Sequence, residues 1–238
     1  MITPGEIQFV REHLEDDVHH LLLGKHKYPG LDVPKCVLQI EGLRKMRDKI
    51  PEWYACKQIF IPSLLALEQA SSQATARYKQ RFCEGREQVV DLTGGLGVDA
   101  YYFAQKSERV VYLEKEPWLC RAAEHNFSVL RAGTGLNVLR GDAALFREQL
   151  SDISYDSMVY ADPSRRQEGR RLRDITLYSP DITQIRESVM DKAAAFLVKI
   201  SPLADISRTL SLLPGTVEVH VVSVGNECKE LLFLMKKD

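Results

Sequence analysis

The residues with the clearest chemical potential lie between positions 88 and 99. There an apolar run ends in an aspartate, passes through three glycines and continues into a segment with helical character. Glycine adopts positive φ and lets a ligand approach the backbone, while the first amide groups of a helix lack intrahelical partners. The pattern predicts a strand, a tight turn and a helix N-terminus around a small ligand. The candidate ligand-binding residues are Asp91, Thr93, Gly94, Gly95, Gly97 and Asp99.

This turn alone does not identify its ligand. Residues 95–100 also satisfy the loose G-x-G-x-x-A pattern of dinucleotide-binding proteins. A nicotinamide or flavin cofactor and S-adenosylmethionine therefore both fit. A glycine-rich turn that binds nothing is a third interpretation.

Acidic residues also follow the next three predicted strands. Glu114 ends one strand, Asp142 follows another and Asp162 ends the third. Ligands of open α/β sheets bind outside the carboxyl ends of the strands. One carboxylate there can accept hydrogen bonds from ribose hydroxyls and another from the exocyclic amine of adenine, although a helix N-cap is an alternative role for Asp142. Together the acids favour a ligand with an adenosine and an amino acid moiety.

Seven predicted strands carry these residues, and helical segments separate the first six. The last two strands are joined by the short segment 225–229, which is too short for a parallel crossover. We therefore predict an α/β, Rossmann-like sheet with an antiparallel terminal hairpin, an ending that disfavours a dehydrogenase. The predicted strands span 88–92, 109–114, 136–140, 157–161, 194–200, 216–224 and 230–235.

The chain before residue 88 has helical periodicity and no predicted strand. A capping box, Thr3 to Glu6, begins an amphipathic helix that reaches about residue 22, and further helices are predicted over 34–49 and 62–82. We expect a helical extension over 1–87 and a nucleotide-type domain over 88–238. In the third helix, a face formed by Gln69, Ser72, Thr75 and Lys79 either covers the cofactor or is solvated, and solvation is the expected case.

The composition limits which kinds of partner, metal site and cellular location are expected for the chain. The 32 lysines and arginines almost cancel the 33 aspartates and glutamates, so net charge does not indicate a nucleic-acid partner. The five scattered cysteines and six histidines show no metal-ligand spacing. We expect reduced thiols, no metal and no membrane segment, which together favour the cytoplasm.

These motifs as a set resemble the class I S-adenosylmethionine-dependent methyltransferases. The resemblance covers about residues 75–238. It implies that residues 91–97 form the cofactor loop, Glu114 binds the ribose, Asp142 lies on the adenine side, and Asp162 with Pro163 forms the catalytic motif.

A narrower resemblance rests on four segments and points to bacterial methyltransferases that carry a C-terminal THUMP-like domain. It implies that this domain, which is expected to grip RNA, lies outside the present chain. The four segments are LEQASS at 67–72, ARYK at 76–79, DPSRR at 162–166 and VVSVGNECKEL at 221–231.

Methyl transfer is an in-line displacement, so a protein mainly aligns donor and acceptor and handles one proton. Asp162 could accept a hydrogen from the attacking atom, and Pro163 would fix the backbone; a plain strand-ending turn is the alternative. Families that methylate base amines follow such a pair with a second proline and an aromatic residue, where this chain has Ser164 and Arg165. The acceptor atom is therefore left open, and Cys228 is not expected to act as a nucleophile.

Five arginines occupy 164–173, directly after the predicted catalytic strand. Arginine suits phosphate oxygens, and we expect Arg165, Arg166, Arg170 and Arg171 to bind an RNA substrate. A solvated loop whose arginines pair with nearby aspartates is the alternative. The leading function is thus RNA methylation. A methyltransferase for a small molecule or a protein, and a non-catalytic adenosine-binding module, remain alternatives.

Overall fold

The computed structural model of the chain describes residues 1–133, 135–145, 153–164, 166–167, 170–171 and 175–237. At its centre lies a seven-stranded sheet with the order β3-β2-β1-β4-β7-β9-β8. The first five of these strands run parallel, and β9 is antiparallel to both of its neighbours. The strands are β1 (Gln88–Asp91), β2 (Arg109–Glu114), β3 (Leu136–Arg140), β4 (Ser157–Ala161), β7 (Ala195–Ile200), β8 (Thr216–Val224) and β9 (Glu227–Lys236).

The terminal hairpin confirms the predicted fold class, and the structure adds where its strands lie. The last strand, β9, inserts between β7 and β8, so β8 is the edge strand. The side chains of the two strands explain why β9 is internal and β8 lies at the edge. Residues 231–235 of β9 are apolar and buried on both faces, as an internal strand requires, whereas β8 exposes Val217 and Val221.

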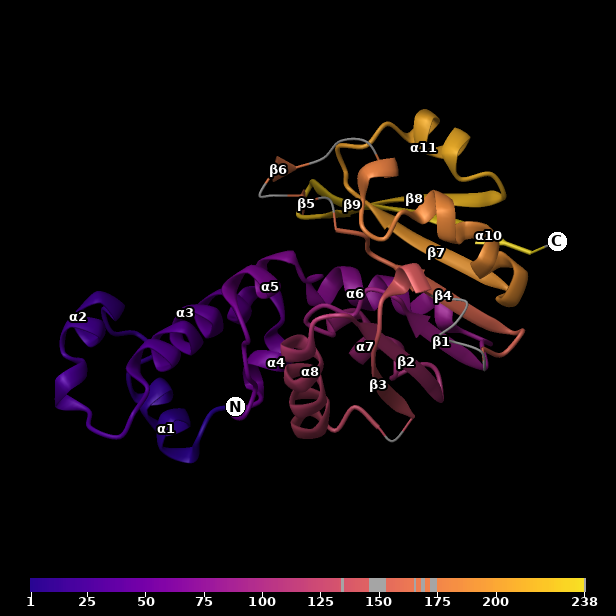
Figure 1. Cartoon of the computed structure of the whole chain (residues 1–238). Coiled ribbons are helices and arrows are strands. Elements are labelled where there is room, and N and C mark those ends of the chain that lie inside the picture. Colours follow the sequence, from indigo (N-terminus) through magenta and orange to yellow (C-terminus); the bar gives the residue numbers. More distant parts are fainter. Residues whose placement is uncertain (134, 146–152, 165, 168–169, 172–174, 238) are drawn as a thin grey trace.

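Helices cover both faces of this sheet (Figure 1). Alternate strand residues divide the core into two clusters, because successive side chains of a strand point to opposite faces. One cluster joins α7 (Val98–Phe103), α8 (Pro117–Leu130) and the N-terminal helices to the sheet, and the other contains α10 (Ile182–Lys192). Near the second face also lie η4 (Ile175–Leu177) and α11 (Ile206–Leu212), while η3 (Ala143–Leu145) follows β3.

The N-terminal segment is helical; the second predicted helix is present as α3, whereas the first and the third are divided. Asp17 starts a new helix by accepting from the amides of His19 and His20, so the first predicted helix divides in two. Ser72 likewise caps a new helix through the amide of Thr75 and divides the third. The helices are α1 (Pro4–Glu12), α2 (Val18–Leu23), η1 (Lys25–Lys27), α3 (Val33–Lys49), α4 (Pro51–Ala55), α5 (Leu64–Gln69), α6 (Gln73–Lys79) and η2 (Gln80–Cys83).

Two buried side-chain amides hold the backbone between α4 and α5, one from the sheet layer and one from within the segment. Asn126 of α8 accepts from the amide of Phe60 and donates to its carbonyl, both at 2.8 Å. Gln39 of α3 makes the same pair of bonds with Ile61, at 2.9 and 2.8 Å. The backbone between α4 and α5 is therefore paired from both sides.

Replacing Asn126 with alanine should lower the free energy of unfolding by about 2–4 kcal/mol, because two backbone groups would lose their partners. Urea unfolding of the purified protein measures this change. The matched control is Gln8→Ala, which removes an exposed bond to Glu12 and should stay within about 0.5 kcal/mol of the wild type. Equal effects of the two substitutions would contradict the fastening role.

Candidate active site at the carboxyl ends of the strands

The glycine loop is held between the ends of β1 and β2. Its Thr93 amide donates to the Asp91 carboxylate at 2.9 Å. The Gly95 amide donates to Glu114 at 2.9 Å, and the Tyr112 hydroxyl donates to the Gly95 carbonyl at 2.7 Å. The predicted loop residues and the acid of the next strand therefore lie together.

Two of the loop glycines are required by neighbouring aromatic rings. A Cβ on Gly94 would lie 2.2 Å from the ring of Tyr112, and one on Gly97 would lie 2.6 Å from the ring of Phe127. Gly97 also has a φ of +89°, which favours glycine. The loop is thus pressed onto the sheet and onto α8, a contact that the sequence pattern did not reveal.

Glu114 and Asp142 lie on neighbouring parts of this edge. Glu114 accepts from the amides of Gly95 and Glu116 through different carboxylate oxygens, each of which keeps further acceptor capacity. Asp142 is exposed and accepts from the amide of Ala144 at 2.9 Å. That bond supports the capping role considered as an alternative for Asp142, and the exposed carboxylate still faces solvent.

Asp91 is the buried acid of the site, with 1% of its surface exposed. Burial raises the pKa of its carboxyl to about 8, and the nearby carboxylates of Asp99, Asp162 and Glu114 act in the same direction against the hydrogen bond from Thr93. A carboxyl in this setting gains from a cationic group that enters the site. The structure therefore presents a site suited to a positively charged ligand.

Asp162 is held from two sides at the end of β4. Its backbone amide donates to the Thr93 hydroxyl at 2.6 Å, which ties it to the glycine loop. Its carboxylate pairs with Lys199 of β7 at 2.6 Å. Pro163, which follows, is buried. Sequence reasoning missed Lys199, although a lysine within the apolar run of a predicted strand was a usable signal.

Asp99 lies in a buried cluster rather than at the surface of the loop. Its carboxylate accepts from Ser71 at 2.7 Å and Tyr160 at 2.9 Å, and it pairs with Lys79 at 3.0 Å. Lys79 is fully buried, so the expected solvated face of the third helix was wrong at this position. Glu230, which also pairs with Lys79, was not among the predicted residues.

The arginine segment begins directly after the predicted catalytic motif, and the chain returns to its start at Ser179. Ser164 and Ser179 form an antiparallel bridge with hydrogen bonds of 2.8 and 3.0 Å, which closes the base of the segment between them. Within it, β5 (Arg166–Gln167) pairs with β6 (Arg170–Arg171). Arg165 lies outside the described residues, and so do the side chains of Arg166, Arg170 and Arg171.

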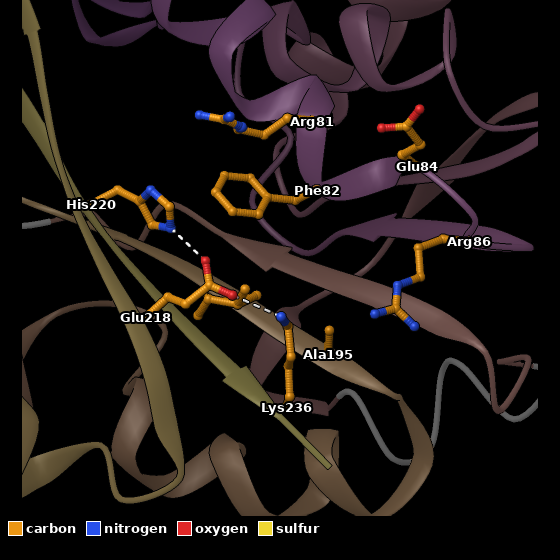
Figure 2. A pocket seen from close by; sticks show the side chains of 9 residues that line it. Arg81, Phe82, Glu84, Arg86, Ala195, Glu218, His220 and Lys236 are labelled. Carbon is orange, nitrogen blue, oxygen red and sulfur yellow. Dashed lines mark hydrogen bonds and ion pairs between the residues drawn. The ribbon is translucent and has the colours of Figure 1, made fainter. Parts of the chain in front are cut away.

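A separate hollow of about 340 Å³ lies away from these residues (Figure 2). Its lining includes Arg86, which precedes β1, Ala195 at the start of β7 and Lys236 at the end of antiparallel β9. It therefore lies at the amino-terminal edge of the parallel strands, opposite the predicted site. Glu218 pairs there with His220 and Lys236.

Two other classes of site are not represented among the described residues. No group of three or more histidine, cysteine, aspartate or glutamate side chains among them is placed to hold a metal ion. In the same part of the chain, no helix combines the length and apolar character needed to cross a membrane.

Relatives were found both by sequence and by structure, while no family model matches the chain. An uncharacterized S-adenosylmethionine-dependent methyltransferase of Mycobacterium tuberculosis is 28% identical over 165 residues, which are 69% of this chain and 43% of that protein. Ribosomal RNA small subunit methyltransferase J of Agrobacterium fabrum is 28% identical over 140 residues, covering 51% of this chain and 65% of that enzyme.

A crystal structure described as a methyltransferase from Porphyromonas gingivalis W83 superposes with a TM-score of 0.83 and 33% identity. The match covers 98% of this chain and 57% of that one. The chain thus spans about half the length of the Mycobacterium and Porphyromonas proteins. The chain thus has the α/β fold of the class I S-adenosylmethionine-dependent methyltransferases and is similar in sequence to proteins described as such.

Proposed function

We propose that the whole protein transfers a methyl group from S-adenosylmethionine to RNA, with Asp162 at the acceptor. The observation that carries the proposal is the meeting of the glycine loop and Asp162 through the hydrogen bond between the Thr93 hydroxyl and the Asp162 amide. This contact puts a cofactor loop next to a carboxylate that follows the fourth parallel strand, at the ligand-binding edge of the sheet.

The residues present fit S-adenosylmethionine. The glycines let the loop lie close against Tyr112 and Phe127 at the strand ends, Asp91 is a buried carboxyl suited to a cation, and Glu114 has acceptor capacity for ribose hydroxyls. When bound, the cofactor supplies an electrophilic methyl group on a sulfonium. We propose binding roles for Asp91, Thr93, Gly94, Gly95, Gly97, Glu114 and Asp142, and a supporting role behind the loop for Asp99.

Asp162 would accept a hydrogen from the attacking atom of the substrate, and buried Pro163 would fix the backbone that presents it. The backbone of Asp162 is anchored by the loop and its carboxylate by Lys199. Anchoring both parts limits the orientations that the carboxylate can take, which favours the alignment that in-line transfer needs.

RNA is the favoured substrate class for two reasons. The arginine-rich segment follows the proposed catalytic motif directly in the chain, and the bridge between Ser164 and Ser179 returns the chain to that motif, where phosphate contacts would be useful. The relative from Agrobacterium fabrum is named for its action on ribosomal RNA. Binding by Arg165, Arg166, Arg170 and Arg171 is part of this proposal, and a small-molecule or protein substrate is the outcome that would replace it.

Substituting Glu114 with alanine should weaken binding of S-adenosylmethionine by about 10- to 100-fold, because a carboxylate that accepts hydrogen bonds would be lost. Isothermal titration calorimetry of the whole protein gives this ratio. Glu116→Ala is the matched control, since Glu116 is a nearby acid whose contact is an exposed bond to Trp118. Unchanged affinity in Glu114→Ala would defeat the ribose assignment.

The raised pKa of Asp91 predicts a pH dependence of stability without cofactor. The folded chain should hold a proton on this carboxyl between about pH 4 and pH 8, where the unfolded chain releases it. Stability therefore falls as pH rises through this range, by up to about 1.4 kcal/mol per pH unit. Asp91→Asn should remove this part of the slope, while Asp156→Asn, at an exposed acid, should keep it.

Urea unfolding at several pH values, compared between the wild type and both variants, measures the difference. If Asp91→Asn and the wild type show the same slope, the carboxyl is ionised in the folded protein over this range and the assignment fails.

The direct test of the function is transfer of radiolabelled methyl groups to RNA from cells that lack the gene, with protein and metabolite fractions from the same cells as comparisons. The RNA fraction should accept the label. Asp162→Ala should reduce transfer by about 100-fold or more, in the range of lost proton-transfer catalysis, and leave cofactor affinity within about twofold. Label in metabolites alone would refute the RNA assignment, and undiminished transfer by Asp162→Ala would refute its catalytic role.

A further inference from the structure

The buried Lys79, the partly exposed Lys199 and three carboxylates form one connected cluster beneath the proposed acceptor site. The ammonium of Lys79 lies 3.0 Å from an oxygen of Asp99 and 3.0 Å from one of Glu230. Lys199 lies 2.6 Å from Asp162 and 3.9 Å from Glu230. Glu230 therefore stands between the two lysines, and Asp162 stands at the end of the row.

The exposure of the side chains rises along this row. Lys79 is 0% exposed and Glu230 is 3% exposed. Lys199 is 14% exposed and Asp162 is 32% exposed. The row thus begins in the interior and reaches solvent at Asp162, the residue that the proposed function places at the acceptor.

The neighbouring charges favour the ionised forms of two members of the cluster, Lys199 and Asp99. Burial alone would disfavour the ammonium of Lys199, but the carboxylates of Asp162, Glu230 and Asp99 raise its pKa above the usual value. Burial likewise opposes ionisation of Asp99, whereas Lys79, Lys199 and the Ser71 hydroxyl lower its pKa. For Lys49 of α3, burial and the positive charge of Lys199 lower the pKa to about 8.

Such a cluster is expected to contribute little to the free energy of unfolding. The desolvation of buried ions can cancel their mutual attraction, and well-packed apolar residues often do as well. A role in the reaction is a reason to retain it. The cluster also draws on five separate elements, α6, α7, β4, β7 and β9, so its geometry exists only when these elements are assembled.

We propose that Lys199, supported by Glu230 and Lys79, is a positioning residue that fixes the Asp162 carboxylate for methyl transfer. The inference rests on the proposed function of Asp162. Lys199 contacts one carboxylate oxygen, Oδ2, and among the described residues no hydrogen bond is made to the other, Oδ1. Oδ1 is then the oxygen that accepts from the substrate.

A double-mutant cycle in the whole protein tests this role. Lys199→Met should lower kcat for transfer to RNA by about 30-fold and leave KM for RNA and the Kd of S-adenosylmethionine within about threefold. Lys199→Arg should recover most of the loss, since it keeps the charge and a donor. In an Asp162→Ala background, Lys199→Met should cost less than about twofold more, because a residue that acts through Asp162 has nothing left to position.

The control is Lys236→Met, which removes an exposed ion pair with Glu218 from the same sheet, at the hollow shown in Figure 2. It should leave kcat unchanged. Should Lys199→Met fail to fold in urea titrations, Lys199→Gln replaces it in the cycle, with an expected loss of about 5- to 10-fold.

A full loss from the Lys199 substitution in the Asp162→Ala background, or unchanged kcat in the single variant, would overturn the proposal. Failure of the function itself gives a different result: the wild type then transfers no label to RNA. In that case the same cycle on whichever fraction accepts the label still decides the role of Lys199.

Discussion

The pairing of buried charges between α6 and the sheet is the constraint on which the rest of the site depends. Lys79 enters the core from α6, where burial of its amino group is compensated by the carboxylates of Asp99 and Glu230. Asp99 opens α7, the helix after the glycine loop, and Glu230 lies on β9 beside β7. Lys79 thereby connects the N-terminal helical segment both to α7, behind the glycine loop, and to β9, beside Lys199.

The sheet order explains why these groups converge. Because β1, β4 and β7 are neighbouring parallel strands, Asp91, Asp162 and Lys199 emerge at the same edge. Because β9 is antiparallel to β7, the amino-terminal part of β9, which contains Glu230, lies at the same edge. Asp162 is bonded to Thr93 of the glycine loop on one side and to Lys199 of β7 on the other. The glycine loop and the proposed acceptor residue are therefore directly connected.

The sequence predicted much of this arrangement. The strands, the glycine loop and the acids after β1 to β4 follow from apolar runs that end in carboxylates, a local pattern. Two helices of the N-terminal segment were predicted as too long, because the caps at Asp17 and Ser72 lie within otherwise helical periodicity. The face with Thr75 and Lys79 was expected to be solvated, but both side chains are buried, because periodicity does not say what covers a face.

The sequence by itself thus determined the fold class, the strand that bears each acid and the family of the loop, since these depend on residues near one another in the chain. Tertiary structure alone decided the order of β9 and β8, the crowding of Gly94 by Tyr112, and the pairing of Lys79 and Lys199 with distant carboxylates. Each of these joins segments separated by many residues. A charge in the sequence has no partner until packing brings one within a few ångströms, and burial then makes that partner obligatory.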